Sequence, residues 1–315
     1  VGLRETQECP STTRGQSPGV LPGQRYTSPM IRVIQLSILI LTVWPTSAVL
    51  GLQADSSTDP EKVITASRIE KSIVVDGILD EPEWNLAQPV IDFVQRDPRT
   101  GEPATELTEI RLLYDDQNLY LGVYCFDSAG SKGIVVNDIR RDFDPRDSDG
   151  FVIILDTFDD DRNGSMFNFN ALGAKFDMQA GDNGRKRNSD WDGIWYVTTQ
   201  ITESGWHAEV AIPFKTLRFS NQDQQIWGVN FQRRIRRTNE SAQWSLVPRP
   251  YAPDRVSRAG RLEGLSGLRP GRNLYVKPYL TAPLIRLQGD DVDFVPDAGF
   301  DLKYGLGSQL ALDLT

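Results

Sequence analysis

Between residues 63 and 265, hydrophobic and polar residues alternate in short runs that are bounded by Gly, Pro, Ser, Asn or Asp. A period of two is typical of β-strands with one face packed on a core. The predicted strands are residues 63–69, 72–80, 109–114, 118–126, 151–158, 166–172, 195–201, 206–212 and 227–235. No long amphipathic helix is predicted, and helical turns are expected only near 81–84 and 213–217. The pattern therefore predicts an all-β fold, a jelly-roll-like β-sandwich of two sheets.

Short acidic turns join two pairs of these strands. Asp115-Asp116-Gln117 separates residues 109–114 from 118–126, and residues 159–164 separate the next pair, which predicts two hairpins. Trp84 is expected to anchor the core, and Cys125, in an apolar strand, is expected to be buried.

Residues 274–287 and 300–315 show a weaker alternation, with tyrosines at 275, 279 and 304 and the polar turn 288–291 between them. Long strands with one apolar face, polar turns and aromatic residues are typical of membrane β-barrels. We therefore expect residues 269–315 to be the first strands of a barrel in a longer protein. The alternative is an extra hairpin at an edge of the sandwich.

The N-terminal residues predict export. Residues 1–29 are polar and rich in Gly, Pro, Ser and Thr, which predicts a disordered upstream extension. Met30 and Arg32 precede the apolar run 33–44, and the small residues 46–48 follow it, so that 30–48 is expected to be a signal peptide, with an anchored helix as second choice. Residues 49–62 are then a linker, and 63–268 form the sandwich. The expected location is the periplasm or outer membrane of a bacterium.

Composition excludes several functions. Lys and Arg number 34 against 43 Asp and Glu, a net charge of −9, which disfavours nucleic acid as a partner. With only Cys9, Cys125 and His207, the chain can build neither a disulfide framework nor a Cys/His zinc site. A Ser-His-Asp triad would need His207, which the alternation predicts to be a solvent-facing strand residue.

Acidic and aromatic residues gather in residues 140–197. Carboxylates accept hydrogen bonds from hydroxyl groups and indoles stack on apolar C–H faces, so this region suits a hydroxylated ligand. The candidate ligand-binding residues here are Arg146, Asp149, Asp190, Trp191, Asp192 and Trp195. The alternative is that they are packing and turn residues of an ordinary sheet.

Asp159, Asp161 and Asn163, with Gly164, fit the first half of a calcium loop, D-x-D-x-N-G. Position twelve of that loop would be Asn170 instead of Glu, and both flanks are predicted strands. An acidic hairpin turn is the preferred interpretation, and Ca²⁺ is the one cofactor that the sequence suggests.

An ordered set of motifs resembles the family 9 carbohydrate-binding module. It consists of VDGILDEPEW at 75–84, IRLLYDDQNLYLGVY at 110–124, SDGF at 148–151, WHAEVAIPF at 206–214 and WGVN at 227–230. Residues 140–142, 191–195 and 256–258 further resemble a bacterial subgroup in which this module precedes an outer-membrane barrel of uncharacterised function.

The resemblance implies a β-sandwich that binds the ends of sugar chains between two tryptophans, with an oligo- or polysaccharide as partner. This chain departs from that pattern. Arg146, in the loop DPRDSD, stands where the first stacking tryptophan is expected, and Tyr251 lies near the second position.

Three functions compete. The first is a non-catalytic carbohydrate-binding module that serves polysaccharide catabolism or uptake at the outer membrane. The second is a structural or gating periplasmic domain that has lost sugar binding. The third is part of a glycoside hydrolase, although the sequence singles out no pair of carboxylates for that chemistry.

Overall fold

The computed structural model describes residues 62–269, 274–281, 284–286, 292–294, 296–306 and 310–314. The predicted upstream extension, the signal peptide and all of the predicted linker except Lys62 lie outside the described residues. Within them, strands predominate, and the helical segments are short 3₁₀ turns, which confirms the all-β prediction.

The strands within residues 62–269 form two sheets. The larger sheet has the order β1-β14-β12-β6-β7-β8-β9, and β13 joins β3 to β12 beside this row. Its strands are β1 (Val63–Thr65), β3 (Val94–Asp97), β6 (Gly150–Asp156), β7 (Gly164–Asn170), β8 (Lys175–Gly181), β9 (Lys186–Asn188), β12 (Gln224–Ile235), β13 (Glu240–Gln243) and β14 (Gly260–Ser266). The smaller sheet has the order β10-β11-β5-β4-β2. Its strands are β2 (Ser67–Arg68), β4 (Thr108–Tyr114), β5 (Asn118–Phe126), β10 (Tyr196–Thr202) and β11 (Gly205–Pro213).

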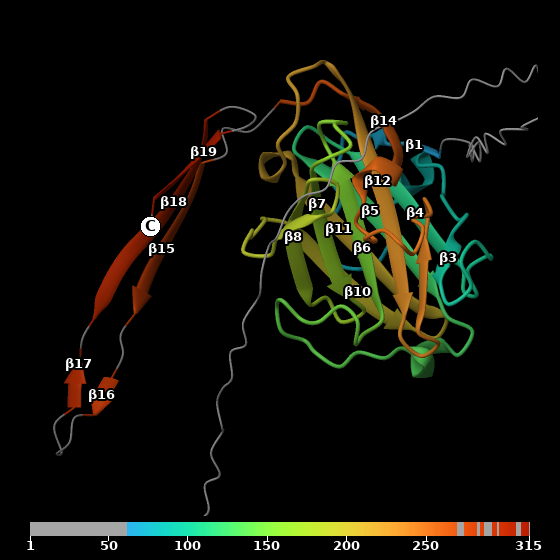
Figure 1. The fold of residues 1–315 in the computed structure, drawn as a ribbon, viewed down its shortest axis with the longest axis horizontal. Helices are drawn as coiled ribbons and strands as arrows, with labels where there is room; N and C mark the ends of the chain where they lie inside the picture. Colours follow the sequence, from blue (N-terminus) through green and yellow to red (C-terminus); the bar gives the residue numbers. More distant parts are fainter. Residues whose placement is uncertain are drawn as a thin grey trace, which may run out of the picture. The chain divides into compact units, whose positions relative to one another are not determined.

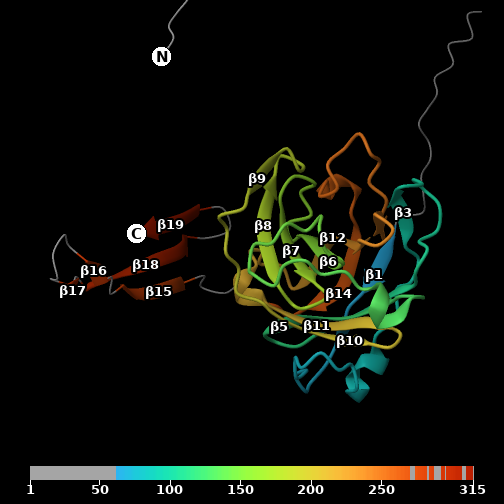
Figure 2. The ribbon, with the colours of Figure 1, turned by 90° about the horizontal axis from the view of Figure 1, so that it is seen from below.

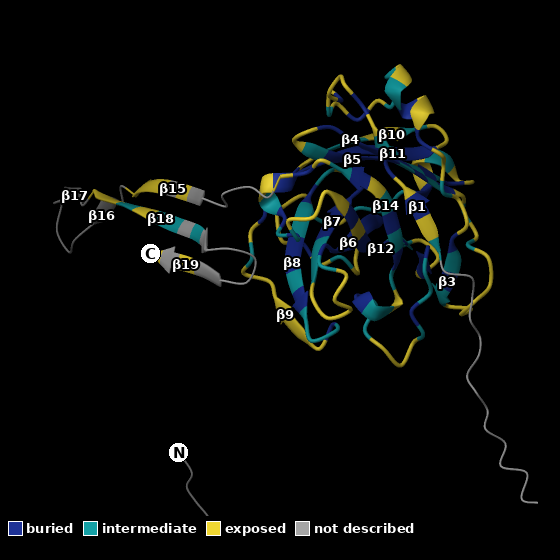
Figure 3. Ribbon diagram, turned by 90° about the horizontal axis from the view of Figure 1, so that it is seen from above, coloured by how far each residue is buried: buried dark blue, intermediate teal, exposed yellow. Residues whose placement is uncertain are grey.

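The two sheets face each other as the layers of a sandwich (Figure 1, Figure 2). Alternate residues of the central strands point between the layers, among them Phe151 and Ile153 of β6 and Phe231 of β12, which are fully buried. Figure 3 shows the buried residues on the facing strands and the exposed ones in the connecting loops. Cys125 also lies in this core, as predicted, and its burial raises the pKa of the thiol to about 12.

The outer face of the smaller sheet is covered by the segment between β2 and β3. Ile69, Ile73 and Trp84, the last in the 3₁₀ turn Pro82–Leu86, pack there on Leu113 and Tyr120. The prediction that Trp84 is a core residue is therefore confirmed. The strand predicted at 72–80 was wrong, because this segment contains no strand and its residues pack across the sheet instead of pairing with an edge.

The remaining 3₁₀ turns are Gly130–Gly133, Phe214–Thr216 and Val256–Arg258, the second of which matches the turn predicted at 213–217. Val256 packs on Val152 and Ile154 of β6, on the outer face of the larger sheet. The chain that follows β13 therefore covers part of that face.

Two further sheets lie C-terminal to residue 273. Strands β15 (Leu274–Thr281), β18 (Asp297–Leu306) and β19 (Leu310–Leu314) form an antiparallel sheet, and β16 (Leu284–Arg286) pairs with β17 (Val292–Phe294). The register pairs Val276 with Leu302 and Leu280 with Ala298. No helix in the part of the chain that the structure describes is long and apolar enough to span a membrane.

Candidate functional site

Residues 189–195, which join β9 to β10, are held in place by a buried carboxylate. Asp177 of β8 accepts a hydrogen bond from the backbone N–H of Gly193 at 2.5 Å and pairs with Arg141, which also pairs with Asp192. Burial raises the pKa of Asp177, and these donors oppose that shift. Asp192 is thus an ion-pair partner that orders the loop, while Asp190 is exposed beside it.

This anchoring gives the two tryptophans of the loop different environments. Trp195 is 1% exposed and contacts Phe167 with the ring centroids 5.4 Å apart, while the Nζ atom of Lys175 lies 5.3 Å from its ring centre. Trp191 is half-buried and also contacts Phe167, with the ring centroids 5.7 Å apart. Trp195 is therefore part of the core and presents no face to a ligand in this structure, whereas Trp191 remains accessible.

Trp191 lines a cavity of about 880 Å³. The wall is built from the turn between β6 and β7, the ends of β7 and β8, strand β9 and the segment after β11. The polar side chains of the lining include Asn163, Ser165, Gln179, Asn188 and Thr216. The cavity thus combines an indole with amide and hydroxyl groups, which is the combination expected for a hydroxylated ligand.

The same cavity is rich in positive charge. Arg162, Lys186, Arg187 and Arg218 line it, and Asp160 is the one acidic residue among the described residues of the lining. Arg187 is paired with the buried Asp254 at 2.7 Å. Asp160 accepts backbone N–H bonds from Arg162 and Asn163 at 2.8 Å each, so its charge serves the turn.

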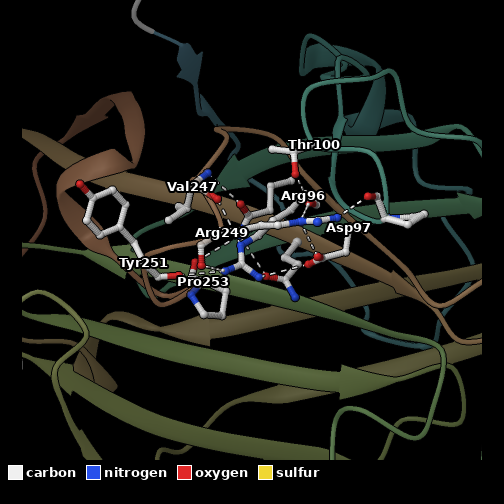
Figure 4. A network of polar contacts seen from close by, with 10 residues as sticks. Arg96, Asp97, Thr100, Val247, Arg249, Tyr251 and Pro253 are labelled. Atoms are coloured by element: carbon white, nitrogen blue, oxygen red, sulfur yellow. Dashed lines mark hydrogen bonds and ion pairs between the residues drawn. The ribbon is translucent and has the colours of Figure 1, made fainter. Parts of the chain in front are cut away.

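Arg146 and Tyr251, which were predicted to bind the same ligand, do not line this cavity. They belong to a second group of residues, which also contains Arg96, Asp97, Arg234 and Arg249. Figure 4 shows its network of polar contacts, in which Arg96 donates from Nη2 to the carbonyl of Tyr251 at 2.8 Å and Arg249 pairs with Asp97 at 2.9 Å. Arg234 of β12 donates from Nε to the carbonyl of Arg146 at 2.9 Å. The first two contacts fix the loop after β13 to β3, and the third fixes the loop before β6 to β12.

The side chains of Arg146 and Tyr251 already have partners in this second group. The guanidinium of Arg146 binds the carboxylate of Asp144 at 2.6 Å and lowers the pKa of that carboxyl to about 2. Tyr251 is 41% exposed, and the guanidinium carbon of Arg255 lies 4.1 Å from the centre of its ring. The structure therefore places the predicted site residues in two groups instead of one cleft.

Asp149 is a structural residue in this arrangement. It is fully buried, and its carboxylate accepts the backbone N–H of Val135 at 2.7 Å, while its own backbone binds Val135 and Ala171. Burial raises the pKa of this carboxyl. Asp149 therefore holds the loop before β6 to the sheet and does not line an open surface.

The predicted calcium-binding residues lie in the hairpin turn between β6 and β7. The side chain of Asn163 donates to Asp160 at 2.7 Å, and Asp159 lies 3.4 Å from Arg261. The backbone N–H of Asp161 binds the carboxylate of Asp156. In the described part of the chain, no group of three or more His, Cys, Asp or Glu side chains could hold a metal ion. Calcium binding at this turn stays a prediction.

Sequence reasoning missed the cationic half of the cavity. Arg162 lies in a turn, Lys186 in strand β9 and Arg218 in the segment after β11, and only the run Arg185-Lys186-Arg187 could have drawn attention in the sequence. The pairing of β7 with β8 and of β8 with β9 brings Arg162 near Lys186. The distant Arg218 is brought to them by the hydroxyl of Thr157, which donates to its carbonyl.

The chain matches the family described as carbohydrate family 9 binding domain-like over residues 75–243. This match covers more than half of the sequence, so the chain belongs to that family, and the predicted resemblance is confirmed at this level. No curated protein matches the chain.

Solved structures of similar fold include a presumed carbohydrate-binding protein from Bacteroides uniformis, with 12% identity, a TM-score of 0.53 and coverage of 64% of this chain and 99% of that one. A family 9 carbohydrate-binding module from Caldicellulosiruptor kristjanssonii in complex with cellotriose shares 20% identity, with a TM-score of 0.47 and coverage of 65% and 96%. Its glucose complex gives 18% identity, the same score, and coverage of 66% and 96%. The likeness to the Bacteroides structure supports the sandwich fold.

Proposed function

We propose that this chain is a non-catalytic carbohydrate-binding domain that takes a glycan into the cavity beside Trp191. The observation that carries the proposal is the cavity itself, in which a half-buried indole faces amide, hydroxyl and guanidinium groups. Membership of the carbohydrate-binding family supports it.

The cavity suits a short saccharide in size and chemistry. Its volume of about 880 Å³ lies within the range of about 300–1,000 Å³ that is usual for small-molecule sites. The side chains of Ser165 and Gln179 make no hydrogen bond within the described part of the chain, and so they can donate to and accept from sugar hydroxyls. The indole of Trp191 offers a surface for the apolar C–H groups of a pyranose ring.

The composition of the lining favours binding over cleavage. Glycosidases generally place two carboxylates on either side of the scissile bond. Of the described residues around this cavity, Asp160 alone carries a carboxylate, and three N–H donors occupy it.

The substitution Trp191→Ala tests this proposal. We expect isothermal titration with the oligosaccharides that the wild-type chain binds to show a loss of at least about tenfold in affinity, because removal of a stacking ring commonly costs more than about 1.4 kcal/mol. The control is Tyr251→Ala, which removes an aromatic ring of the second group and should leave the affinity unchanged.

Because Trp191 also packs on Phe167, the Trp191→Ala variant should be somewhat less stable. Titrations should therefore be done well below the melting temperature of each variant. A loss of binding in Tyr251→Ala with retention in Trp191→Ala would place the ligand in the second group and contradict the proposal.

A structural or gating domain without sugar binding is the second candidate. It is favoured by the occupied side chains of Arg146 and Tyr251, which stand where the family resemblance predicts two stacking rings. A screen against a broad set of neutral and acidic glycans that yields no binding would favour this candidate over the first.

We also propose that the protein is exported and that strands β15–β19 begin an outer-membrane β-barrel. In the β15–β18 pair, the neighbours Val276 and Leu302, Pro278 and Phe300, and Leu280 and Ala298 make one face apolar. Val276, Leu280 and Phe300 are 49%, 74% and 59% exposed, as lipid-facing residues of a barrel strand would be. Recovery of the protein in the outer-membrane fraction of cells would support this proposal, and recovery in the soluble fraction would contradict it.

A further inference from the structure

The cavity beside Trp191 carries more positive charge than a neutral sugar requires. Four cationic side chains line it in a chain whose net charge is −9. Uncharged saccharides are bound well by amides, hydroxyls and rings, so the excess of cations demands a separate explanation.

Three of the four cations have no partner among the residues that the structure describes. The side chains of Arg162, Lys186 and Arg218 make no ion pair or hydrogen bond with other residues that the structure describes, whereas Arg187 is paired with Asp254. Surface arginines elsewhere in the chain, such as Arg140 and Arg146, are bound to an aspartate two residues away. Three cations without a described partner therefore line this one cavity.

The cations come from elements that the fold brings together around Trp191. Arg162 lies in the turn between β6 and β7, Lys186 begins β9, and Arg218 follows the 3₁₀ turn Phe214–Thr216. Guanidinium groups bind carboxylate and sulfate oxygens with paired, charge-assisted hydrogen bonds, while the indole side of the cavity can accept the ring that bears the anion.

From this geometry we infer that the cavity selects anionic saccharides, that is, chains that contain uronic acid or sulfated sugar units. The inference rests on the proposed function, since it names the ligand class of the same site. In the inferred complex, Trp191 contacts the sugar ring. Arg162, Lys186 and Arg218 bind the acidic group.

The test compares two probes of similar length, an oligogalacturonate and a neutral cello-oligosaccharide, by isothermal titration with the wild-type chain. We expect tighter binding of the oligogalacturonate. The double substitution Arg162→Gln/Arg218→Gln should weaken it at least about tenfold, because a charge-assisted hydrogen bond contributes about 1.5–3 kcal/mol. The affinity of the wild-type chain for oligogalacturonate should also fall as the sodium chloride concentration rises from about 0.05 M to about 0.5 M, because salt screens the charges.

The control is Arg185→Gln, which removes one guanidinium charge from an exposed residue next to Lys186 that does not line the cavity. It should leave the affinity for oligogalacturonate within about twofold of wild type. Circular dichroism of each variant checks that the fold is intact.

Four outcomes would overturn the inference. Equal binding of both probes, with loss only in Trp191→Ala, would leave the proposed function in place and remove the anionic specificity. Oligogalacturonate binding that is insensitive to Arg162→Gln/Arg218→Gln would place the anion elsewhere. Full displacement by an equal concentration of inorganic sulfate would show a simple anion site. Binding of neither probe, nor of any glycan in the screen, would contradict the proposed function as well.

Discussion

At the scale of single residues, the buried carboxylate of Glu209 links the smaller sheet to the segment that covers it. Its Oε2 atom accepts the backbone N–H groups of Asp76 and Gly77 at 2.9 Å each, and its Oε1 atom accepts the indole N–H of Trp84 at 3.1 Å. Glu209 is fully buried, and burial raises the pKa of its carboxyl to about 7 although these donors oppose the shift.

This raised pKa predicts a pH dependence of stability. The folded state binds the proton of Glu209 more tightly than the unfolded state, whose pKa is near 4.5. The resulting contribution to the free energy of unfolding is fully present below about pH 4.5 and is lost as the pH rises through about 7. We therefore expect the melting temperature of the wild-type chain to fall more steeply over this range than that of Glu209→Gln, which cannot titrate.

Thermal melts of both proteins at closely spaced pH values would measure the difference. Asp156, whose pKa burial raises to about 6, titrates in the same range and is present in both proteins, so that its effect cancels. Parallel curves for the two proteins would show that Glu209 does not titrate as expected.

The sequence allowed Trp84 and Cys125 to be predicted as core residues, because each stands in a pattern with a clear apolar side. The sequence could not predict that Trp195 is buried while Trp191 is accessible. Their difference depends on the contacts of Asp177 with Gly193 and Arg141, which come from another strand and a distant loop. Side-chain burial in a loop is decided by tertiary contacts that periodicity does not record.

At the scale of elements, alternation located the central strands well. Strands β4, β5, β6 and β11 begin and end within about two residues of the predicted ranges. Strands β3, β8, β9, β13 and β14 were not predicted. β13 illustrates the reason, because Glu240, Ser241 and Gln243 are buried polar residues that give no apolar pattern. One of its two neighbouring strands, β3, is also far away in the sequence.

The hairpin between β10 and β11 depends on a glycine. Gly205 has φ of +139°, and a Cβ atom there would lie 2.1 Å from the carbonyl oxygen of Cys125 on β5. We expect Gly205→Ala to lower the free energy of unfolding by more than the roughly 1–3 kcal/mol of backbone strain alone, since the strands must also move apart. Urea denaturation would measure the loss.

Gly101→Ala is the control for Gly205→Ala. Gly101 also has a positive φ, +87°, but no atom lies within 4 Å of a Cβ added there. This variant should show the cost of backbone strain without a clash. Similar losses in the two variants would mean that the contact between β11 and β5 is not as tight as the structure shows.

At the scale of the whole molecule, one buried arginine joins the two layers of the sandwich. Arg233 of β12, in the larger sheet, is fully buried. Its Nη1 atom donates to the carbonyl of Leu107 at 2.8 Å, and its Nη2 atom donates to the carbonyl of Phe126 at 2.5 Å, both at ends of strands in the smaller sheet. Polar bonds across a core otherwise filled by apolar side chains fix the position of one sheet on the other.

The substitution Arg233→Met tests this connection, because methionine fills much of the same space without donating to either carbonyl. Two carbonyl oxygens lose a donor, although that of Leu107 keeps the backbone N–H of Phe126. We therefore expect the free energy of unfolding to fall by about 1–3 kcal/mol. The control is Arg234→Met, on the next residue of the same strand, where the side chain binds the carbonyl of Arg146 on the other side of the sheet. Urea denaturation should show the larger loss in Arg233→Met.

Glycan affinity, measured where both variants are fully folded, should stay at the wild-type value in each, because neither residue lines the cavity beside Trp191. Equal stability of the two variants would mean that apolar packing alone holds the sheets together.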